Sequence, residues 1–210
     1  MADRTYGGAT RRTTTEIRGD DWPGEDISGT THENVAFVDV DFVDSVDTGG
    51  TFNECTFRDC QFNASTHTGA AFVNCTFSGC SFFDATFTDC KLVGSVFERC
   101  TFGLLKVVGG DWSFVGLATA DLRGASIVGT RLREADLTGV QLQKAVLQHA
   151  DLAGAALHRV EMTGADLRGS DLSAVDPVAT RIRGAIIDAQ QAVVLAEALG
   201  VVVREDAPRR

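Results

Sequence analysis

Residues 51–65 read TFNECTFRDCQFNAS, and this stretch repeats one pattern every five residues. Phe stands at 52, 57 and 62, and a small residue stands three places after each, at Cys55, Cys60 and Ser65. An α-helix would repeat its apolar face every 3.6 residues and a strand every two, so neither element alone explains the pattern. Each five-residue unit is therefore predicted to form one side of a coil, with one large and one small side chain inside.

The same register runs through most of the chain. Of the 34 positions taken every fifth residue from Trp22 to Ile187, 30 hold Phe, Leu, Ile, Val, Met or Trp. The four exceptions are His32, Asp47, His67 and Pro177. The unbroken period predicts a single solenoid over residues 19–187.

Four stretches spell the repeat almost identically: ADLRG (120–124), ADLTG (135–139), ADLAG (150–154) and ADLRG (165–169). They resemble the pentapeptide-repeat family, whose consensus is A-D/N-L-x-x. The resemblance implies an all-β solenoid, a right-handed quadrilateral β-helix with four units and therefore twenty residues in each coil. Glycines at the fifth place, such as Gly69, Gly124 and Gly154, suit type II turns at the corners.

The two ends need caps, because the last coil of a solenoid exposes unpaired strand edges. Residues 188–210 are predicted to supply a helix, a short strand and a tail. Asp188 is suited to cap the helix with Gln191 three places on, Gly200 to close it, and Val201–Val203 to form the strand. Residues 1–18 are rich in Gly, Thr and Arg, lack the period, and are predicted to be a disordered extension.

Charge is unevenly distributed along the chain. The net charge is -10, and residues 19–100 contain 14 acidic and 3 basic residues, whereas residues 101–187 contain 9 of each. A net anion has no long-range attraction to nucleic acid or to anionic membranes, so a basic protein is the expected partner. No secretory signal and no membrane span is recognised, which predicts a cytoplasmic protein.

We predict that acids of the first half form the partner-binding surface, since many of them depart from the Asp position of the consensus. Taken modulo twenty, they fall on one face and its edges. An acidic surface kept only for solubility is the alternative. The predicted binding residues are Asp20, Asp21, Asp39, Asp41, Asp44, Asp59 and Asp84.

The candidate reactive groups favour structural roles. The six cysteines all stand at multiples of five, so they are predicted to be buried thiols rather than disulfides or zinc ligands. Asp47 and His67 occupy large-residue sites one coil apart and could pair. A catalytic dyad is one interpretation, but the register places no nucleophile beside them, which favours an outward bulge or an internal hydrogen bond. No enzyme activity, metal or cofactor is expected.

A narrower resemblance rests on TFNECTF, GAAFVNCTF and KLVGSVFERCTF within residues 51–102, on GLLKVVGGDW, and on DAQQAVVLAEALG. These segments are similar to the mycobacterial fluoroquinolone-resistance group of MfpA and, more distantly, to Qnr. The resemblance implies a rod that mimics DNA, binds DNA gyrase or topoisomerase IV, and blunts quinolones. It also implies a homodimer through the C-terminal helix, with Val193, Val194, Leu195 and Leu199 as the predicted interface. The alternative function is a structural or adaptor rod for another basic protein.

Overall fold

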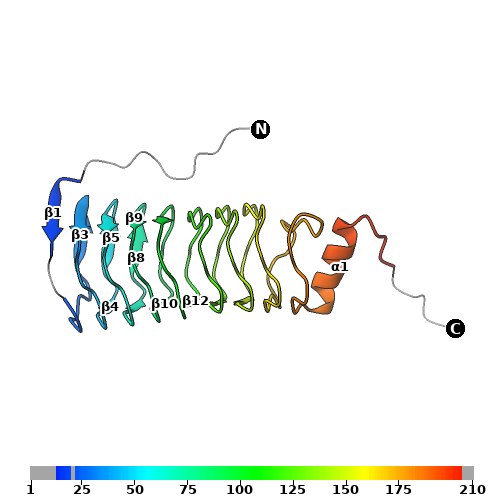
Figure 1. The fold of residues 1–210 in the computed structure, drawn as a ribbon, viewed down its shortest axis with the longest axis horizontal. Helices are drawn as coiled ribbons and strands as arrows, with labels where there is room; N and C mark the ends of the chain where they lie inside the picture. The colour runs from blue at the N-terminus through cyan, green and yellow to red at the C-terminus, as the bar shows by residue number, and fades with distance from the viewer. Residues whose placement is uncertain (1–12, 20–21, 205–210) are drawn as a thin grey trace.

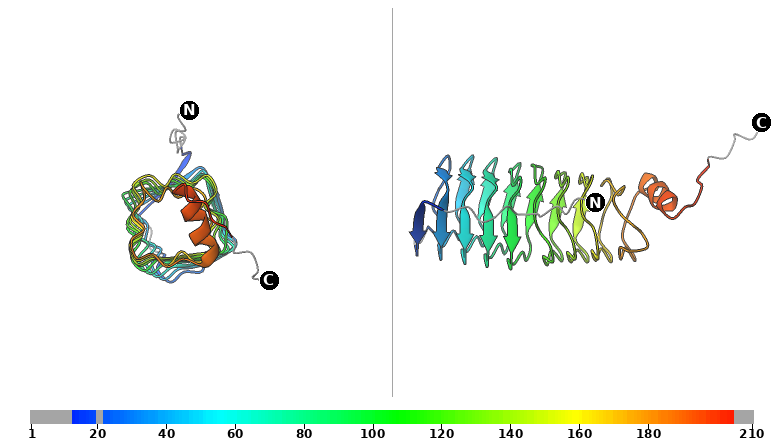
Figure 2. Two further views of the ribbon diagram at one scale, coloured as in Figure 1. Left: turned by 90° about the vertical axis from the view of Figure 1, so that its right-hand side faces the viewer. Right: turned by 90° about the horizontal axis from the view of Figure 1, so that it is seen from above.

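The computed structural model describes residues 13–19 and 22–204. It is a parallel β-solenoid followed by one helix, and the coils stack into a straight rod (Figure 1). Viewed along the rod, the described coils have four sides (Figure 2). The strands are β1 (Thr15–Arg18), β2 (Thr31–Glu33), β3 (Val35–Val38), β4 (Val46–Thr48), β5 (Thr51–Asn53), β6 (Thr56–Arg58), β7 (Thr66–Thr68), β8 (Ala71–Val73), β9 (Thr76–Ser78), β10 (Thr86–Thr88), β11 (Val96–Glu98), β12 (Lys106–Val108), β13 (Ser126–Val128) and β14 (Val146–Gln148), and the helix is α1 (Ala189–Ala198).

Every ladder joins residues twenty positions apart, as four units per coil require. Phe57 lies between Phe37 and Phe77 in one sheet, for example. The sheets have the orders β1-β3-β6-β9-β11, β14-β13-β12-β10-β7-β4 and β2-β5-β8. The fourth side consists of isolated bridges through Asp41, Gln61, Ser81 and Thr101, and then through Asp121, Gln141, Glu161 and Arg181. We call this side the bridge face.

The corners adopt a left-handed backbone conformation at residue numbers that end in four or nine. Gly69, Gly124 and Gly154 have φ between 62° and 71°, as the sequence predicted. The structure adds that many corners hold another residue in the same conformation, such as Asn74 at φ 52°. Asp and Asn tolerate this conformation better than other side chains, and they hold seven of the seventeen non-glycine corners among the described residues.

The large residues of the register form ladders inside the rod. Phe37, Phe57, Phe77 and Phe97 make one stack with ring centroids 4.7–4.8 Å apart. All four rings are at most 5% exposed. A fully buried Phe contributes about 1.5–3 kcal/mol of hydrophobic free energy, so such ladders supply the main stabilising term. In the second half, leucines such as Leu117 and Leu137 continue this column.

The N-terminal end begins earlier than expected. Residues 1–18 were predicted to be disordered, but Thr15–Arg18 form β1 and pair in parallel with β3. Ile17 lies opposite Phe37 and packs against the core, one unit before Trp22 on the same register. Pairing with the edge strand β3 and the contact of Ile17 with the core order this segment, although its Gly-, Thr- and Arg-rich composition predicted disorder. The rest of the predicted extension, residues 1–12, lies outside the described residues.

The C-terminal end is capped by α1 as predicted. Asp188 and Gln191 form the reciprocal capping box, with Gln191 N donating to Asp188 Oδ1 at 2.9 Å. That hydrogen bond is the largest cause that lowers the pKa of Asp188. Gly200 N donates to Glu197 O and Val201 N to Ala196 O, which closes the helix in a Schellman motif. Within the part of the chain that the structure describes, no helix is long and apolar enough to cross a membrane.

Candidate partner-binding surface

The structure brings five of the seven predicted binding acids to one side of the rod. Asp41 lies on the bridge face, where it pairs with Gln61. Asp39 and Asp59 follow β3 and β6 at the corner that leads into this face. Asp44 and Asp84 stand at the next corner, just before β4 and β10. These five residues are called the acidic surface below, and Asp20 and Asp21 lie outside the described residues.

Backbone geometry explains why four of the five positions hold aspartate. Asp39, Asp44, Asp59 and Asp84 have φ between 55° and 56°, in the left-handed region that favours Gly, Asn and Asp. The fifth, Asp41, accepts a hydrogen bond from Val43 N at 2.8 Å. The fold therefore accounts for a short polar residue at these places. It does not account for the negative charge, because Asn would satisfy the same geometry.

The acidic surface differs from the second half of the rod in how its charges are paired. Asp84 forms an ion pair with Lys106 at 2.8 Å. Asp39, Asp41, Asp44 and Asp59 form none with any other described residue, and Asp39, Asp44 and Asp59 are exposed. Their field is therefore directed into solvent.

In the second half, by contrast, arginines pair with several acids of the consensus position. Arg123 Nε donates to Asp121 at 2.8 Å, and this hydrogen bond lowers the pKa of Asp121. The hydrogen bond from Arg168 is the main cause that lowers the pKa of Asp166 to about 2. Further pairs are Asp111 with Arg131, Asp151 with Arg133 and Glu161 with Arg181. The two halves thus present different electrostatic surfaces, as the composition predicted.

Asp47 and His67 form an internal hydrogen bond and are not turned outward. His67 Nδ1 lies 3.2 Å from Asp47 Oδ2, and His67 Nε2 lies 3.0 Å from Ser65 Oγ. All three residues are at most 1% exposed. The bulge expected as one alternative is therefore wrong, and so is the expectation that no hydroxyl stands beside the pair. Ser65 occupies a small-residue site of the register, and the sequence pattern predicted only a small buried side chain there.

The order Ser65, His67, Asp47 resembles a catalytic triad, but its surroundings favour a structural role. Ser65 Oγ donates to Phe62 O at 2.8 Å, and Gly50 N donates to Asp47 Oδ1 at 2.9 Å. These hydrogen bonds fix both side chains inside the coil, so each polar atom of the group has a partner within it. A nucleophile sealed inside the coil cannot meet a substrate.

The thiols are buried, as predicted, except that Cys100 is half-buried. Cys60, Cys80 and Cys100 lie one above another, and each Sγ approaches a carbonyl oxygen of the preceding coil at 3.5 Å. The neighbouring thiol of Cys100 raises the pKa of Cys80, and burial raises that of Cys90 to about 11. Among the described residues, no group of three or more His, Cys, Asp or Glu could hold a metal ion.

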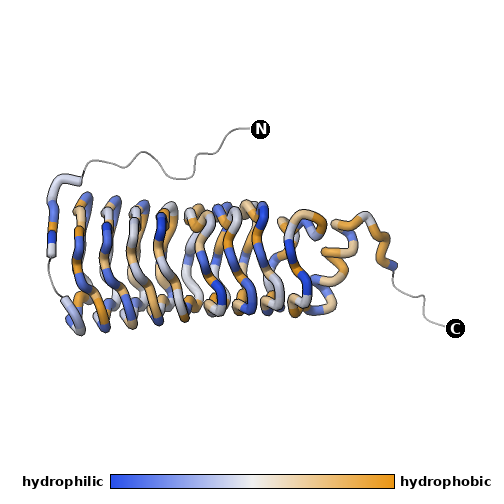
Figure 3. The backbone as a smooth tube through the Cα atoms, in the orientation of Figure 1, coloured by the Kyte–Doolittle hydropathy of each residue, from blue (hydrophilic) through white to orange (hydrophobic). Residues whose placement is uncertain are grey.

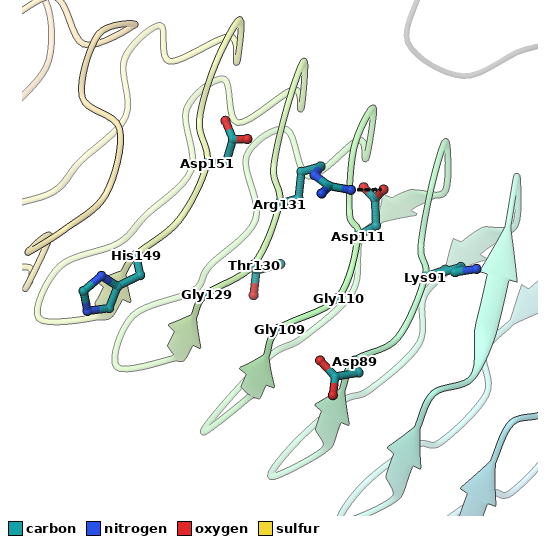
Figure 4. A pocket seen from close by; sticks show the side chains of 10 residues that line it. All are labelled: Asp89, Lys91, Gly109, Gly110, Asp111, Gly129, Thr130, Arg131, His149 and Asp151. Carbon is teal, nitrogen blue, oxygen red and sulfur yellow. Dashed lines mark hydrogen bonds and ion pairs between the residues drawn. The ribbon is translucent and has the colours of Figure 1, made fainter.

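A groove of about 530 Å³ interrupts one corner in the second half (Figure 4). Its floor holds Gly109, Gly110 and Gly129, and Asp89 and His149 stand at its two ends (Figure 4). The remaining lining residues are Lys91, Asp111, Thr130, Arg131 and Asp151, with Arg131 paired to Asp111 at 2.9 Å. Sequence reasoning missed this groove, although glycines at two successive corners of one column signal it. Its charges are of both signs.

The predicted dimer residues divide into two groups. Leu195 is 8% exposed and belongs to the core cluster, so it seals the end of the solenoid, and its assignment to a dimer surface is wrong. Val193 and Leu199 are exposed and Val194 is half-buried. Most residues of the helix and of the segment after it are hydrophobic (Figure 3), and Val201–Val203 are exposed. Val201–Val203 form no strand, because no neighbouring strand lies alongside to pair with them.

Comparison with known proteins agrees with this architecture. Residues 117–148 and 135–173 match the family model of pentapeptide repeats, with eight copies, and residues 26–102 match the model of the SV2A/B/C luminal domain. No curated protein sequence matches the chain.

Among solved structures, a trypsin-treated variant of QnrB1, a plasmid-mediated fluoroquinolone resistance protein, aligns with a TM-score of 0.60 at 20% identity over 90% of this chain and 95% of its own. Full-length QnrB1 aligns with a TM-score of 0.53 at 20% identity, over 89% and 98% of the two chains. At this identity the likeness concerns the fold. The chain is therefore built of pentapeptide repeats and has the β-helix fold of the pentapeptide-repeat proteins.

Proposed function

We propose that this protein binds DNA gyrase as a mimic of DNA, inhibits the enzyme, and protects it from quinolone-type or natural-product inhibitors. The observation that carries the proposal is the acidic surface: a rigid rod with carboxylates on one face and its two corners, most of them without an ionic partner among the described residues. The fold shared with QnrB1, a fluoroquinolone resistance protein, supports the choice of partner.

Physical chemistry makes this partner suitable. Duplex DNA carries one negative charge per roughly 1.7 Å of its axis, and a protein that binds DNA presents cations matched to that field. The β-helix fixes its carboxylates at successive coils about 4.8 Å apart, so they need no ordering when the partner binds. Such a surface attracts a basic groove at long range and competes with DNA for it. Because gyrase acts on chromosomal DNA, the proposal places the protein in the cytoplasm.

We further propose that the protein is a homodimer joined at its C-terminal ends. Val193, Val194 and Leu199 from the predicted interface remain available, and the exposed Val201–Val203 extend the same apolar end. A contiguous apolar patch of this kind on a soluble surface is typical of an association site.

A supercoiling assay with purified gyrase tests the proposal. The protein should inhibit supercoiling at low salt, lose potency as salt rises, and reduce the amount of DNA cleavage complex that a quinolone traps. If it neither inhibits gyrase nor changes the response to the drug, the adaptor function takes the place of this proposal.

A further inference from the structure

Phe83 is an aromatic side chain held on the outside of the rod. It lies on the bridge face next to the acidic surface, directly before Asp84, and is 53% exposed. It stands outside the core register, so the fold does not require an aromatic residue there.

Gly103, one coil further on, explains how the ring is held. Its φ is not in the left-handed region, so the backbone does not call for glycine at this position. A Cβ on Gly103 would instead lie 3.0 Å from Cδ2 and 3.4 Å from Cε2 of Phe83. The absence of a side chain at Gly103 therefore leaves room for the Phe83 ring to lie against this part of the backbone.

Leu104 adds a second exposed apolar group next to Gly103. It is 54% exposed and adopts φ 59° at the corner above Asp84. Asp84 N donates to Gly103 O at 2.7 Å, which holds the two coils together at this point. Leu104 is therefore an exposed apolar side chain that the core does not use, close to Gly103 and Asp84 on the same two coils.

Charged groups surround this apolar pair. Asp84, paired with Lys106, lies on one side, and the Asp121–Arg123 pair lies on the next coil. A shallow groove of about 370 Å³ runs beside Gly103 and includes Thr101 and Arg123 in its lining. An apolar centre within a charged rim is the usual composition of a protein-binding hot spot.

We propose that Phe83 and Leu104 are the apolar anchor with which the acidic surface holds its protein partner. The inference rests on the proposed function and names its occupant: an apolar side chain of gyrase, flanked by the Lys and Arg residues that bind the acidic surface. The phosphate edges of DNA offer no such contact. The carboxylates therefore attract and orient the partner as it approaches. Phe83 and Leu104 then slow its dissociation, which charge alone would not do.

Phe83→Ala and Leu104→Asn test the anchor, since Asn keeps the left-handed corner. Phe114→Ala is a matched control, because Phe114 is also 53% exposed, at φ 60°, on a corner half a coil away from Leu104. In surface plasmon resonance with immobilised gyrase, Phe83→Ala should raise the Kd at least about tenfold, mainly through faster dissociation. Phe114→Ala should change it less than about twofold, and circular dichroism should be unchanged for all variants.

The outcomes separate the anchor from the wider proposal. If Phe83→Ala binds like Phe114→Ala while removal of the carboxylates abolishes binding, the anchor is wrong and the proposed function stands. If the unmutated protein does not bind gyrase at any salt concentration, both are wrong. If Phe83→Ala instead lowers the mass of the free protein in light scattering, the patch is a contact between copies of this chain, and the anchor is again wrong.

Discussion

At the scale of single residues, the pair of Asp47 and His67 interrupts an otherwise apolar interior. His67 stacks on Phe87 with ring centroids 4.7 Å apart, whereas on its other side Asp47 stands where a large apolar residue would continue the column. Burial of a charge is costly unless a partner compensates it. The two residues must therefore be treated as one unit.

We expect His67→Phe alone to lower the free energy of unfolding by about 3–5 kcal/mol, because it leaves the Asp47 carboxylate buried without its partner. The double variant Asp47→Leu with His67→Phe should recover most of that loss, since it restores the apolar column. Urea denaturation followed by circular dichroism measures both. Equal stability of the single and double variants would show that the pair does not act as a unit.

Residue identity was partly predictable from the sequence. The period predicted that Asp47 and His67 share a face, because residues twenty apart stack in a four-sided coil. It could not predict Ser65 as their partner. The period restricts the size of the side chain at this site, but it does not show which neighbouring atom the hydroxyl faces. Nor did it show that corner conformation favours aspartate at Asp39 and Asp59, because φ is a property of the folded backbone.

At the scale of elements, α1 supplies both apolar contact and hydrogen bonds to the last coil. Gln191 is 5% exposed, and its Nε2 donates to Leu167 O at 2.6 Å and to Ser170 O at 2.7 Å. Leu167 O also accepts from Ser170 N at 3.1 Å, whereas Gln191 is the donor to Ser170 O among the described residues. The cap therefore satisfies a backbone carbonyl at the final edge of the solenoid that would otherwise be buried unpaired.

Gln191→Leu should lower the free energy of unfolding by about 1–3 kcal/mol, because the buried carbonyl oxygen of Ser170 loses its donor. Gln190→Leu is the control: Gln190 is exposed on the same turn, so its replacement should have little effect. Thermal melting of the two variants compares them directly. If Gln190→Leu destabilised the protein as much as Gln191→Leu, helix propensity rather than capping would explain the loss.

Elements with strong local signals were predicted well. Asp188, Gln191 and Gly200 mark the ends of α1 because capping is a local interaction. The segments without such signals were not: β1 exists because β3 offers it an edge, and Val201–Val203 form no strand because no edge is offered. Pairing of strands depends on a neighbour, and composition does not show whether that neighbour is present.

At the scale of the whole molecule, the apolar C-terminal end determines the proposed dimer. Leu199→Asp should convert the protein to a monomer, because Leu199 is 55% exposed at the end of the rod and a carboxylate there would be buried between copies. Leu104→Asp is the matched control, since Leu104 is 54% exposed but lies in the middle of the rod. Size-exclusion chromatography with light scattering measures the mass. A monomeric unmutated protein at micromolar concentration would contradict the dimer.

The distribution of charge along the rod leads to the functional prediction. Reversal of Asp39, Asp41 and Asp59 to Lys changes the local charge by six units at the proposed gyrase surface, so inhibition of supercoiling should be lost. The fold should persist, because Asp39 and Asp59 are exposed and each such charge contributes less than about 1 kcal/mol. The half-buried Asp41 also loses the hydrogen bond from Val43 N, which costs about 0.5–1.5 kcal/mol. A milder variant separates charge from conformation: Asn at positions 39 and 59 keeps the left-handed corners and removes only the charge, and it should weaken inhibition without reversing the field.

The control for this experiment reverses three acids of the second half, Asp136, Asp151 and Asp171, which lie outside the bridge face. It makes the same change in net charge at a surface where acids and arginines balance, so a partner attracted only by total charge would respond equally to both sets. A partner that recognises the acidic surface should respond only to the first set, because complementarity acts within a Debye length of roughly 8 Å at physiological ionic strength. If the two triple variants inhibit gyrase equally, recognition depends on net charge, and mimicry of DNA by this face is wrong.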